Sequence, residues 1–142
     1  MDIEALIPHR GRMKLIDDVV AIDAETATTS ALVSASWPLC RGTFVDPIVL
    51  IELVAQTAAV HISWKKGYGR AGRGRGWIVG IKQADFYREE IPVGSKLLTK
   101  VRSLCQIDNY TVLEGEVRAG TETLGRVQIQ VFRSSSDENT IC

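Results

Sequence analysis

A long, almost wholly apolar helix is the feature that most constrains the fold of this chain. Residues 46–66 read DPIVLIELVAQTAAVHISWKK. Asp46 can accept hydrogen bonds from the unpaired N–H groups of a first helical turn. Pro47 suits the first helical position because it has no N–H to leave unpaired. Apolar residues occupy nearly every side of this helix, so we expect a sheet to wrap around it.

β-rich runs on both sides of the helix supply such a sheet. Two runs, 14–22 and 26–36, precede the helix and predict an antiparallel hairpin. The later runs predict a meander of strands; they are 77–87, 96–106, 110–118 and 123–133. The order predicts an α+β fold, with an antiparallel β-sheet wrapped around one long central helix.

Two segments fall outside this pattern. Residues 67–76 are rich in glycine and arginine and predict a loop. The polar residues 134–142 predict a disordered C-terminal tail. We therefore expect a single domain over residues 1–133, since the chain is long enough for one core and short for two.

Charge and cysteine usage exclude several functional classes. Lys plus Arg equals Asp plus Glu at 17 each, so the chain has no net charge to attract a nucleic acid. No apolar run is long enough for a membrane span, and the acidic N-terminus does not resemble a signal peptide. Three cysteines without metal-like spacing predict reduced thiols, a cytoplasmic protein and no metal site.

A carboxylate in the apolar helix is the strongest functional candidate. Glu52 lies in the second turn, with Gln56 one turn further on and able to orient it. Desolvation by an apolar wall raises the pKa of a carboxyl group, which suits it to donate a proton near neutral pH. The alternative is a structural Glu52 held by backbone or Gln56 contacts. We favour function because an unpaired buried acid is costly.

Three motifs follow one another along the chain: LIPHRGRMKLIDDV at 6–19, VLIELVAQTAAV at 49–60 and VGIKQADFYREEIPVGSKLLTKV at 79–101. In this order they resemble the hot-dog-fold 3-hydroxyacyl-acyl-carrier-protein dehydratases, over roughly residues 5–133. A narrower resemblance is to the hot-dog proteins of aryl-polyene-type clusters.

The resemblance implies a hot-dog fold, two protomers paired edge to edge, and an acyl tunnel at their interface. In this family a His of a G-H-F segment in one protomer meets the helix Glu of the other. The His removes the α-proton of the thioester, and the carboxyl group helps the β-hydroxyl leave as water. Glu52 matches that catalytic carboxyl group. The substrate is carried on phosphopantetheine or coenzyme A, and no cofactor is implied.

The chain departs from the family where the His belongs. Gly42-Thr43-Phe44 replaces G-H-F, and the Thr43 hydroxyl does not ionise near neutral pH. Pro47 falls where the family often has a Gly whose N–H polarises the thioester carbonyl, so the donor passes to Ile48 or Val49. The resemblance thus places the substrate against these residues: Gly42, Thr43, Phe44, Ile48, Val49, Gln56 and His9.

Neither histidine is a convincing replacement for the base. His9 matches the family's P-H-R segment, which indicates a structural role in the N-terminal turn or a place near the tunnel. His61 lies about half a turn off the Glu52 face, so we expect it at the dimer interface or against a strand.

A basic segment follows the helix and has two readings of equal weight, a carrier-binding rim or a solvated loop. Its cations are Lys65, Lys66, Arg70, Arg73 and Arg75. As a rim it would attract the acidic acyl-carrier protein or the phosphates of coenzyme A. RNA binding by this Gly/Arg segment is the weaker alternative.

Three functions remain open. The first is a 3-hydroxyacyl-carrier-protein dehydratase relative in fatty-acid or polyketide-like lipid synthesis. The second is a non-catalytic hot-dog subunit that binds acyl chains or pairs with an active dehydratase. The third is a thioesterase in which Glu52 activates a water held by Thr43. Each is compatible with a homodimer or a higher assembly, and the second with a heterodimer.

Overall fold

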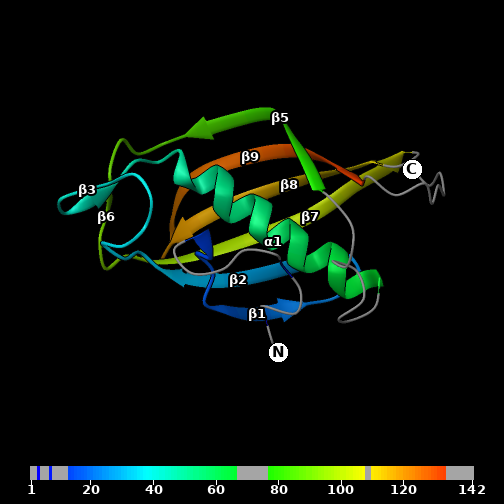
Figure 1. The fold of residues 1–142 in the computed structure, drawn as a ribbon, viewed down its shortest axis with the longest axis horizontal. Coiled ribbons are helices and arrows are strands. Elements are labelled where there is room, and N and C mark those ends of the chain that lie inside the picture. Colours follow the sequence, from blue (N-terminus) through cyan, green and yellow to red (C-terminus); the bar gives the residue numbers. More distant parts are fainter. Residues whose placement is uncertain (1–2, 4–6, 8–12, 67–76, 108–109, 134–142) are drawn as a thin grey trace.

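A six-stranded antiparallel sheet and one long helix make up most of the chain (Figure 1). The computed structural model describes residues 3, 7, 13–66, 77–107 and 110–133. The strands follow the order β1-β2-β7-β8-β9-β5 across the sheet. Their bounds are β1 Asp18–Ile22, β2 Thr26–Leu32, β5 Trp77–Phe86, β7 Lys96–Ile107, β8 Tyr110–Ala119 and β9 Glu122–Arg133, and the helix is α1 Val49–Lys66.

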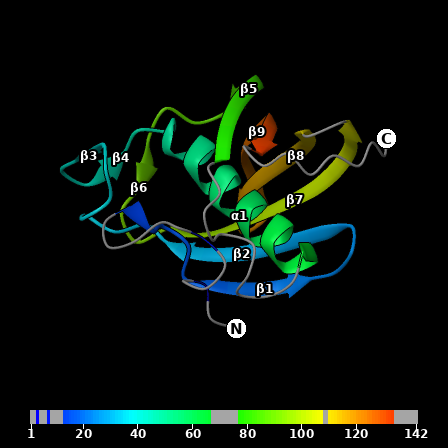
Figure 2. The ribbon, with the colours of Figure 1, turned by 45° about the vertical axis from the view of Figure 1, so that its right-hand side comes forward.

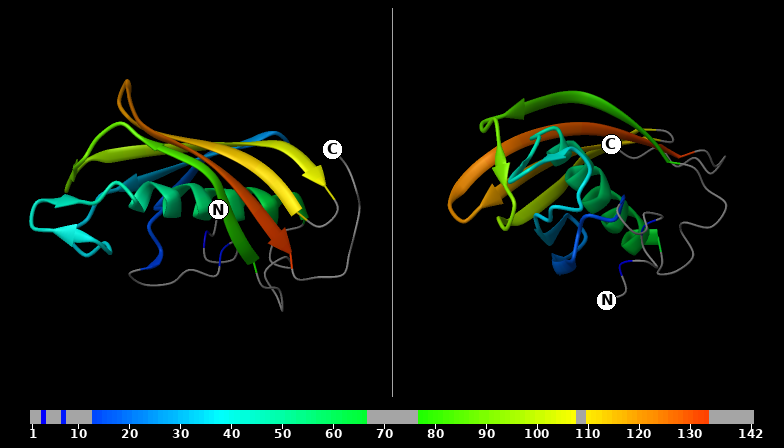
Figure 3. Two further views of the ribbon diagram at one scale, coloured as in Figure 1. Left: turned by 90° about the horizontal axis from the view of Figure 1, so that it is seen from above. Right: turned by 60° about the vertical axis from the view of Figure 1, so that its left-hand side comes forward.

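The sheet curls around α1, which lies on its concave side (Figures 2 and 3). Period-two alternation explains why the sheet has one apolar and one polar face. In β7, Leu97, Thr99 and Val101 are buried toward the helix, whereas Lys100 and Arg102 between and beyond them are exposed. The buried side chains of the helix and sheet join in one core cluster, which also takes in Ile3, Ile7, Leu15 and Ile16 from the N-terminal segment.

A glycine lets α1 approach the middle of the sheet closely. A Cβ atom added at Gly115 of β8 would lie 2.5 Å from Val54 Cγ1, which is closer than real side chains come. The absent side chain therefore fixes how near the helix lies to the strand.

A second, small sheet lies beyond the N-terminal end of α1 (Figure 1). It consists of three two-residue strands in the order β3-β4-β6, with bounds β3 Cys40–Arg41, β4 Phe44–Val45 and β6 Ile91–Pro92. This small sheet holds the chain that leads into the helix.

The predicted cap at Asp46 is present, although the helix begins at Val49 and not at Pro47. The Ile48 N–H donates to Asp46 Oδ1 over 3.0 Å, and the Val49 N–H donates to the Asp46 carbonyl oxygen over 3.1 Å. The helix ends at Lys66, also as predicted. The Asp46 cap and the buried apolar side chains therefore both stabilise this helix.

Two expectations about the strands need correction. The later strands do not form one meander, because β5 pairs with β9 at the sheet edge while β7 returns to pair with β2. The expected strands 14–22 and 26–36 are shorter in the structure, and the three two-residue strands were not predicted.

Cys40 is partly buried and has a free thiol. The expectation of reduced thiols stays a prediction. Among the described residues, no helix is long and apolar enough to cross a membrane. The predicted disordered tail, 134–142, lies outside the described residues.

Candidate active site

Glu52 lies on the least buried face of α1. Ile48 is 48% exposed, and Glu52, Ala55 and Ala59 are partly buried, whereas most other helix positions are buried. These four residues share one face at helical spacing. The carboxyl group of Glu52 thus stands on an apolar, partly accessible surface beside two small side chains.

Gln56 holds Glu52 and the N-terminal segment together. Its side chain is fully buried, and its Nε2 donates to Glu52 Oε2 over 3.0 Å and to the Met13 carbonyl oxygen over 2.6 Å. Its Oε1 accepts from the Leu15 N–H over 3.0 Å. All polar atoms of the Gln56 amide group are therefore engaged, and the position of the Glu52 carboxyl group is tied to the backbone of residues 13–15. The predicted orienting contact is present.

The helix N-terminus does not offer free donors at the expected positions. The Ile48 and Val49 N–H groups both bond to Asp46, and the Leu50 N–H bonds to the Pro47 carbonyl oxygen over 2.9 Å. A thioester carbonyl could take a hydrogen bond from Ile48 or Val49 only by sharing or displacing one of these bonds.

The segment that replaces G-H-F forms the turn between β3 and β4. Gly42 has a φ of 71°, a left-handed conformation that glycine adopts without strain. The exposed Thr43 follows, and its carbonyl oxygen accepts from the Val93 N–H over 2.9 Å. Phe44 is partly buried in β4. These backbone bonds fix the turn, but the hydroxyl at position 43 supplies no base.

His61 lies at the other end of α1 and is fully buried. Its Nε2 is 2.9 Å from the carbonyl oxygen of Asp23, at the turn between β1 and β2. Burial lowers the pKa of His61 below its ordinary 6.5, and the positive charge of Lys65 lowers it further. It is nine residues beyond Glu52, or about 13 Å along a helix. His61 therefore packs against the strand region, which is one of the two positions predicted for it. It is too far from Glu52 to serve as its base.

Several predicted site residues lie outside the described residues, namely His9, Arg70, Arg73 and Arg75, as does the side chain of Lys66. Lys65 is exposed at the last turn of α1, far along the helix from Glu52. No local pattern signals the contacts of Gln56 with Met13 and Leu15, because they join positions 43 and 41 residues apart that meet only in the folded chain.

The described residues therefore provide one positioned carboxyl group and no imidazole beside it. In the part of the chain that the structure describes, no group of three or more His, Cys, Asp or Glu side chains could hold a metal ion. The chemistry that this arrangement supports is proton donation or water activation by a single acid.

Comparisons with known proteins agree on the family and the fold. A family model described as "ApeP-like: ApeP dehydratase" matches residues 1–142. The 3-hydroxyacyl-[acyl-carrier-protein] dehydratase FabZ of Brucella ovis is 29% identical over 147 residues, covering 97% of this chain and 92% of the relative.

Among solved structures, the dehydratase heterocomplex ApeI:P from Xenorhabdus doucetiae matches with a TM-score of 0.76 at 17% identity, covering 95% of this chain and 92% of that chain. The E. coli PaaI protein of the phenylacetic acid degradation operon matches with a TM-score of 0.64 at 16% identity, covering 82% of each chain. The sheet wrapped around one helix is the expected hot-dog fold.

Proposed function

Since the chain belongs to the ApeP-like dehydratase family, we propose that it dehydrates 3-hydroxyacyl thioesters as one half of a composite active site, with Glu52 as the acid. The single observation that carries this proposal is the Glu52 carboxyl group, fixed by Gln56 on the accessible, apolar face of the only helix among the described residues. An apolar surface suits an acyl chain, and a carboxyl group beside it suits proton transfer.

The proposed reaction is an elimination. A base takes the proton from the carbon next to the thioester carbonyl, and that electron pair forms the new double bond as the carbon–oxygen bond breaks. The protonated Glu52 carboxyl group donates its proton to the departing hydroxyl, which leaves as water. The products are an enoyl thioester and water, with one proton left on the base and one lost from Glu52.

No described residue places an imidazole beside Glu52, so the proposal takes the base from a second chain. Thr43 stands where the family has its His, and His61 is held at the far end of the helix by the Asp23 carbonyl oxygen. In the family each site joins the His of one protomer to the Glu of the other. A homodimer of this chain would therefore lack the G-H-F histidine in both sites.

A heterodimer with a hot-dog dehydratase that has the G-H-F histidine would contain one complete site, formed by the partner's imidazole and Glu52. Its other site, with Thr43 facing the partner's carboxyl group, would be silent. Support comes from the structural neighbour that was solved as the dehydratase heterocomplex ApeI:P.

The carrier of the substrate is inferred from the charge of the basic segment. We place the chain in the cytoplasm, acting on an acyl-carrier-protein thioester, with coenzyme A as the alternative carrier. The exposed Lys65 belongs to the basic segment that would attract the acidic carrier.

The test is to measure turnover of 3-hydroxyacyl and enoyl thioesters while recording hydration, dehydration and free thiol release together. We expect the chain alone to be silent and the mixture with a His-containing hot-dog dehydratase to interconvert the two thioesters without releasing thiol. Turnover by the chain alone would contradict the need for a partner. Thiol release would instead identify a thioesterase.

A further inference from the structure

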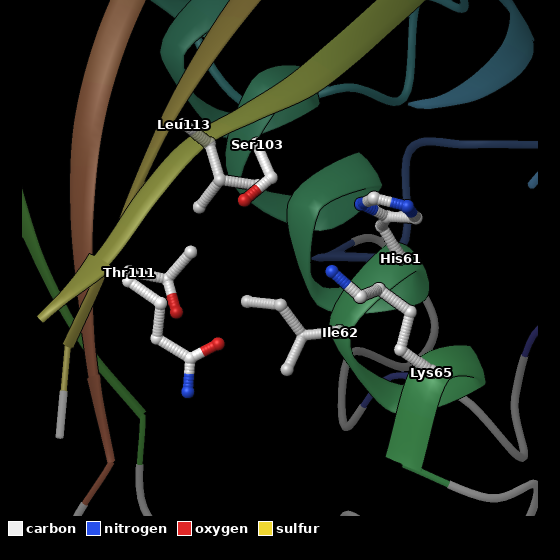
Figure 4. Close-up of a pocket in the computed structure, with 7 residues that line it drawn as sticks. His61, Ile62, Lys65, Ser103, Thr111 and Leu113 are labelled. Carbon is white, nitrogen blue, oxygen red and sulfur yellow. The ribbon is translucent and has the colours of Figure 1, made fainter. Parts of the chain in front are cut away.

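A cavity with both polar and apolar walls lies beside the C-terminal half of α1, on the inner side of β7 and β8. Its volume is about 180 Å³, which is room for several water molecules or a ligand of similar size. The described residues that line it are His61, Ile62, Lys65, Ser103, Gln106, Thr111 and Leu113. Figure 4 shows the helix residues facing the strand residues across this space.

His61 brings an unused hydrogen-bond acceptor to this cavity. Its Nε2 is 2.9 Å from the Asp23 carbonyl oxygen, and since a carbonyl oxygen only accepts, Nε2 holds the hydrogen. The neutral ring then has its lone pair on Nδ1, which is buried and has no hydrogen-bond partner among the described residues. Figure 4 shows one ring nitrogen turned toward the strand side of the cavity. Leaving a buried acceptor unpaired is costly, so the site favours a ligand that brings a donor.

The other polar groups of the cavity favour an anion. Lys65 lies one turn after His61, and its side chain runs back along the helix toward the ring (Figure 4). Ser103, Thr111 and Gln106 add hydroxyl and amide donors, and none of the described lining residues is acidic. The helix C-terminus has about half a negative charge, which the full positive charge of Lys65 outweighs.

We propose that this cavity binds a small hydroxy acid, whose hydroxyl donates to His61 Nδ1 and whose carboxylate accepts from Lys65 Nζ. Ile62 and Leu113 provide the apolar walls for the carbon atoms between these groups. The site is separate from the proposed catalytic face, since Glu52 lies about 13 Å away along the helix.

Nitrogen NMR on protein labelled with ¹⁵N-histidine tests this proposal, because the chain has two histidines and so few ring signals. Glycolate is the probe, and acetate is its matched control with the same charge and no hydroxyl. We expect glycolate to shift the Nδ1 signal of His61 as the nitrogen gains a hydrogen bond. Acetate should bind more weakly, on the order of tenfold, because it leaves Nδ1 unpaired.

Two variants define where the probe binds. Lys65→Met should weaken glycolate binding, since it removes the cation but keeps the length of the side chain. Glu52→Gln should leave glycolate binding unchanged, which separates this proposal from the dehydratase proposal. No Nδ1 shift at tens of millimolar glycolate, equal binding of acetate, or loss of binding in Glu52→Gln would each overturn the site.

Discussion

Gln56 Nε2 donates a hydrogen bond to Glu52 Oε2 over 3.0 Å, one helical turn along α1. The same amide group bonds to the backbone of Met13 and Leu15, so the carboxyl group is positioned by a buried group that is itself held at both ends. This contact links the N-terminal segment, the helix and the proposed acid into one unit. Its removal should affect both folding and turnover.

The Gln56→Met variant tests this unit. The new side chain has a similar shape but leaves the buried Leu15 N–H unpaired, so the free energy of unfolding should fall by about 1–3 kcal/mol. Urea denaturation measures this loss. In the heterodimer assay, kcat should fall about tenfold or more with KM little changed, because the acid loses its orientation.

Gln83→Met is the matched control, since the Gln83 side chain is exposed and, among the described residues, donates to Asp85 Oδ2 at the surface. Its unfolding free energy should change by less than about 0.5 kcal/mol. Equal effects of the two substitutions would show that Gln56 has no special role.

A buried hydroxyl pair joins α1 to β2. The Thr57 and Thr29 hydroxyl oxygens are 2.8 Å apart, and Thr57 also donates to the Leu53 carbonyl oxygen over 2.8 Å. These two bonds make Thr57 the donor to the helix and Thr29 the donor to Thr57. Thr57→Val should cost about 1–3 kcal/mol, because it leaves the Thr29 hydroxyl buried without a partner.

The double variant Thr29→Val/Thr57→Val should cost less than the sum of the single variants, since it removes both polar groups together. A double-mutant cycle by urea denaturation measures the difference. Strict additivity would mean that the two hydroxyls do not interact.

Close packing at Gly115 predicts a steric effect on stability. Gly115→Ala would place a Cβ atom 2.5 Å from Val54 Cγ1, so helix and sheet must separate. We expect a loss of about 1–3 kcal/mol in the free energy of unfolding. Gly80→Ala is the control, because its nearest neighbour, Gln130 Oε1, is at an ordinary 3.7 Å. A control variant as unstable as Gly115→Ala would point to strand propensity rather than packing.

Burial of His61 predicts a dependence of stability on pH. Its pKa in the folded protein is below the ordinary 6.5, because burial and the Lys65 charge disfavour the protonated ring, although the Asp23 carbonyl bond and carboxylate act in the opposite direction. The unfolded chain therefore binds a proton more readily than the folded one. The neutral His61 ring contributes its full share to the free energy of unfolding above pH 6.5. This contribution is lost as the pH falls through the pKa that His61 has in the folded protein.

Urea midpoints for the protein and for His61→Gln, measured from about pH 5 to 8, test this prediction. The decline below pH 6.5 should be smaller in the variant, which has no ring to protonate. Parallel profiles for the two proteins would assign the decline to other groups.

The sequence predicts the helix and the long strands of this fold well, for identifiable physical reasons. Asp46 and Pro47 mark the helix start chemically, and alternating side chains mark the long strands. The strands β3, β4 and β6 have two residues each, which is too short for any alternation to be visible. The edge position of β5 could not be predicted either, because it depends on the crossover between β5 and β7 rather than on a local pattern.

The candidate site also has features that the sequence predicts and features that only the folded chain shows. Glu52 and Gln56 are recognisable because they share a helix face in an apolar run, and the family motif singles them out. The anchoring of Gln56 to Leu15 spans 41 positions and exists only in the folded chain. The contact of His61 with the Asp23 carbonyl oxygen spans 38 positions and likewise has no local signal.

The most direct test of the composite site is a rescue experiment. A G-H-F-containing hot-dog dehydratase is first inactivated by changing its own helix Glu to Gln, so that it keeps its imidazole but has no acid. Adding the present chain should restore dehydration, because Glu52 completes the site, and adding the Glu52→Gln variant should not. If the Glu52→Gln variant restored turnover equally well, or if the unaltered chain formed the heterodimer and restored none, Glu52 would not be the acid of a shared site.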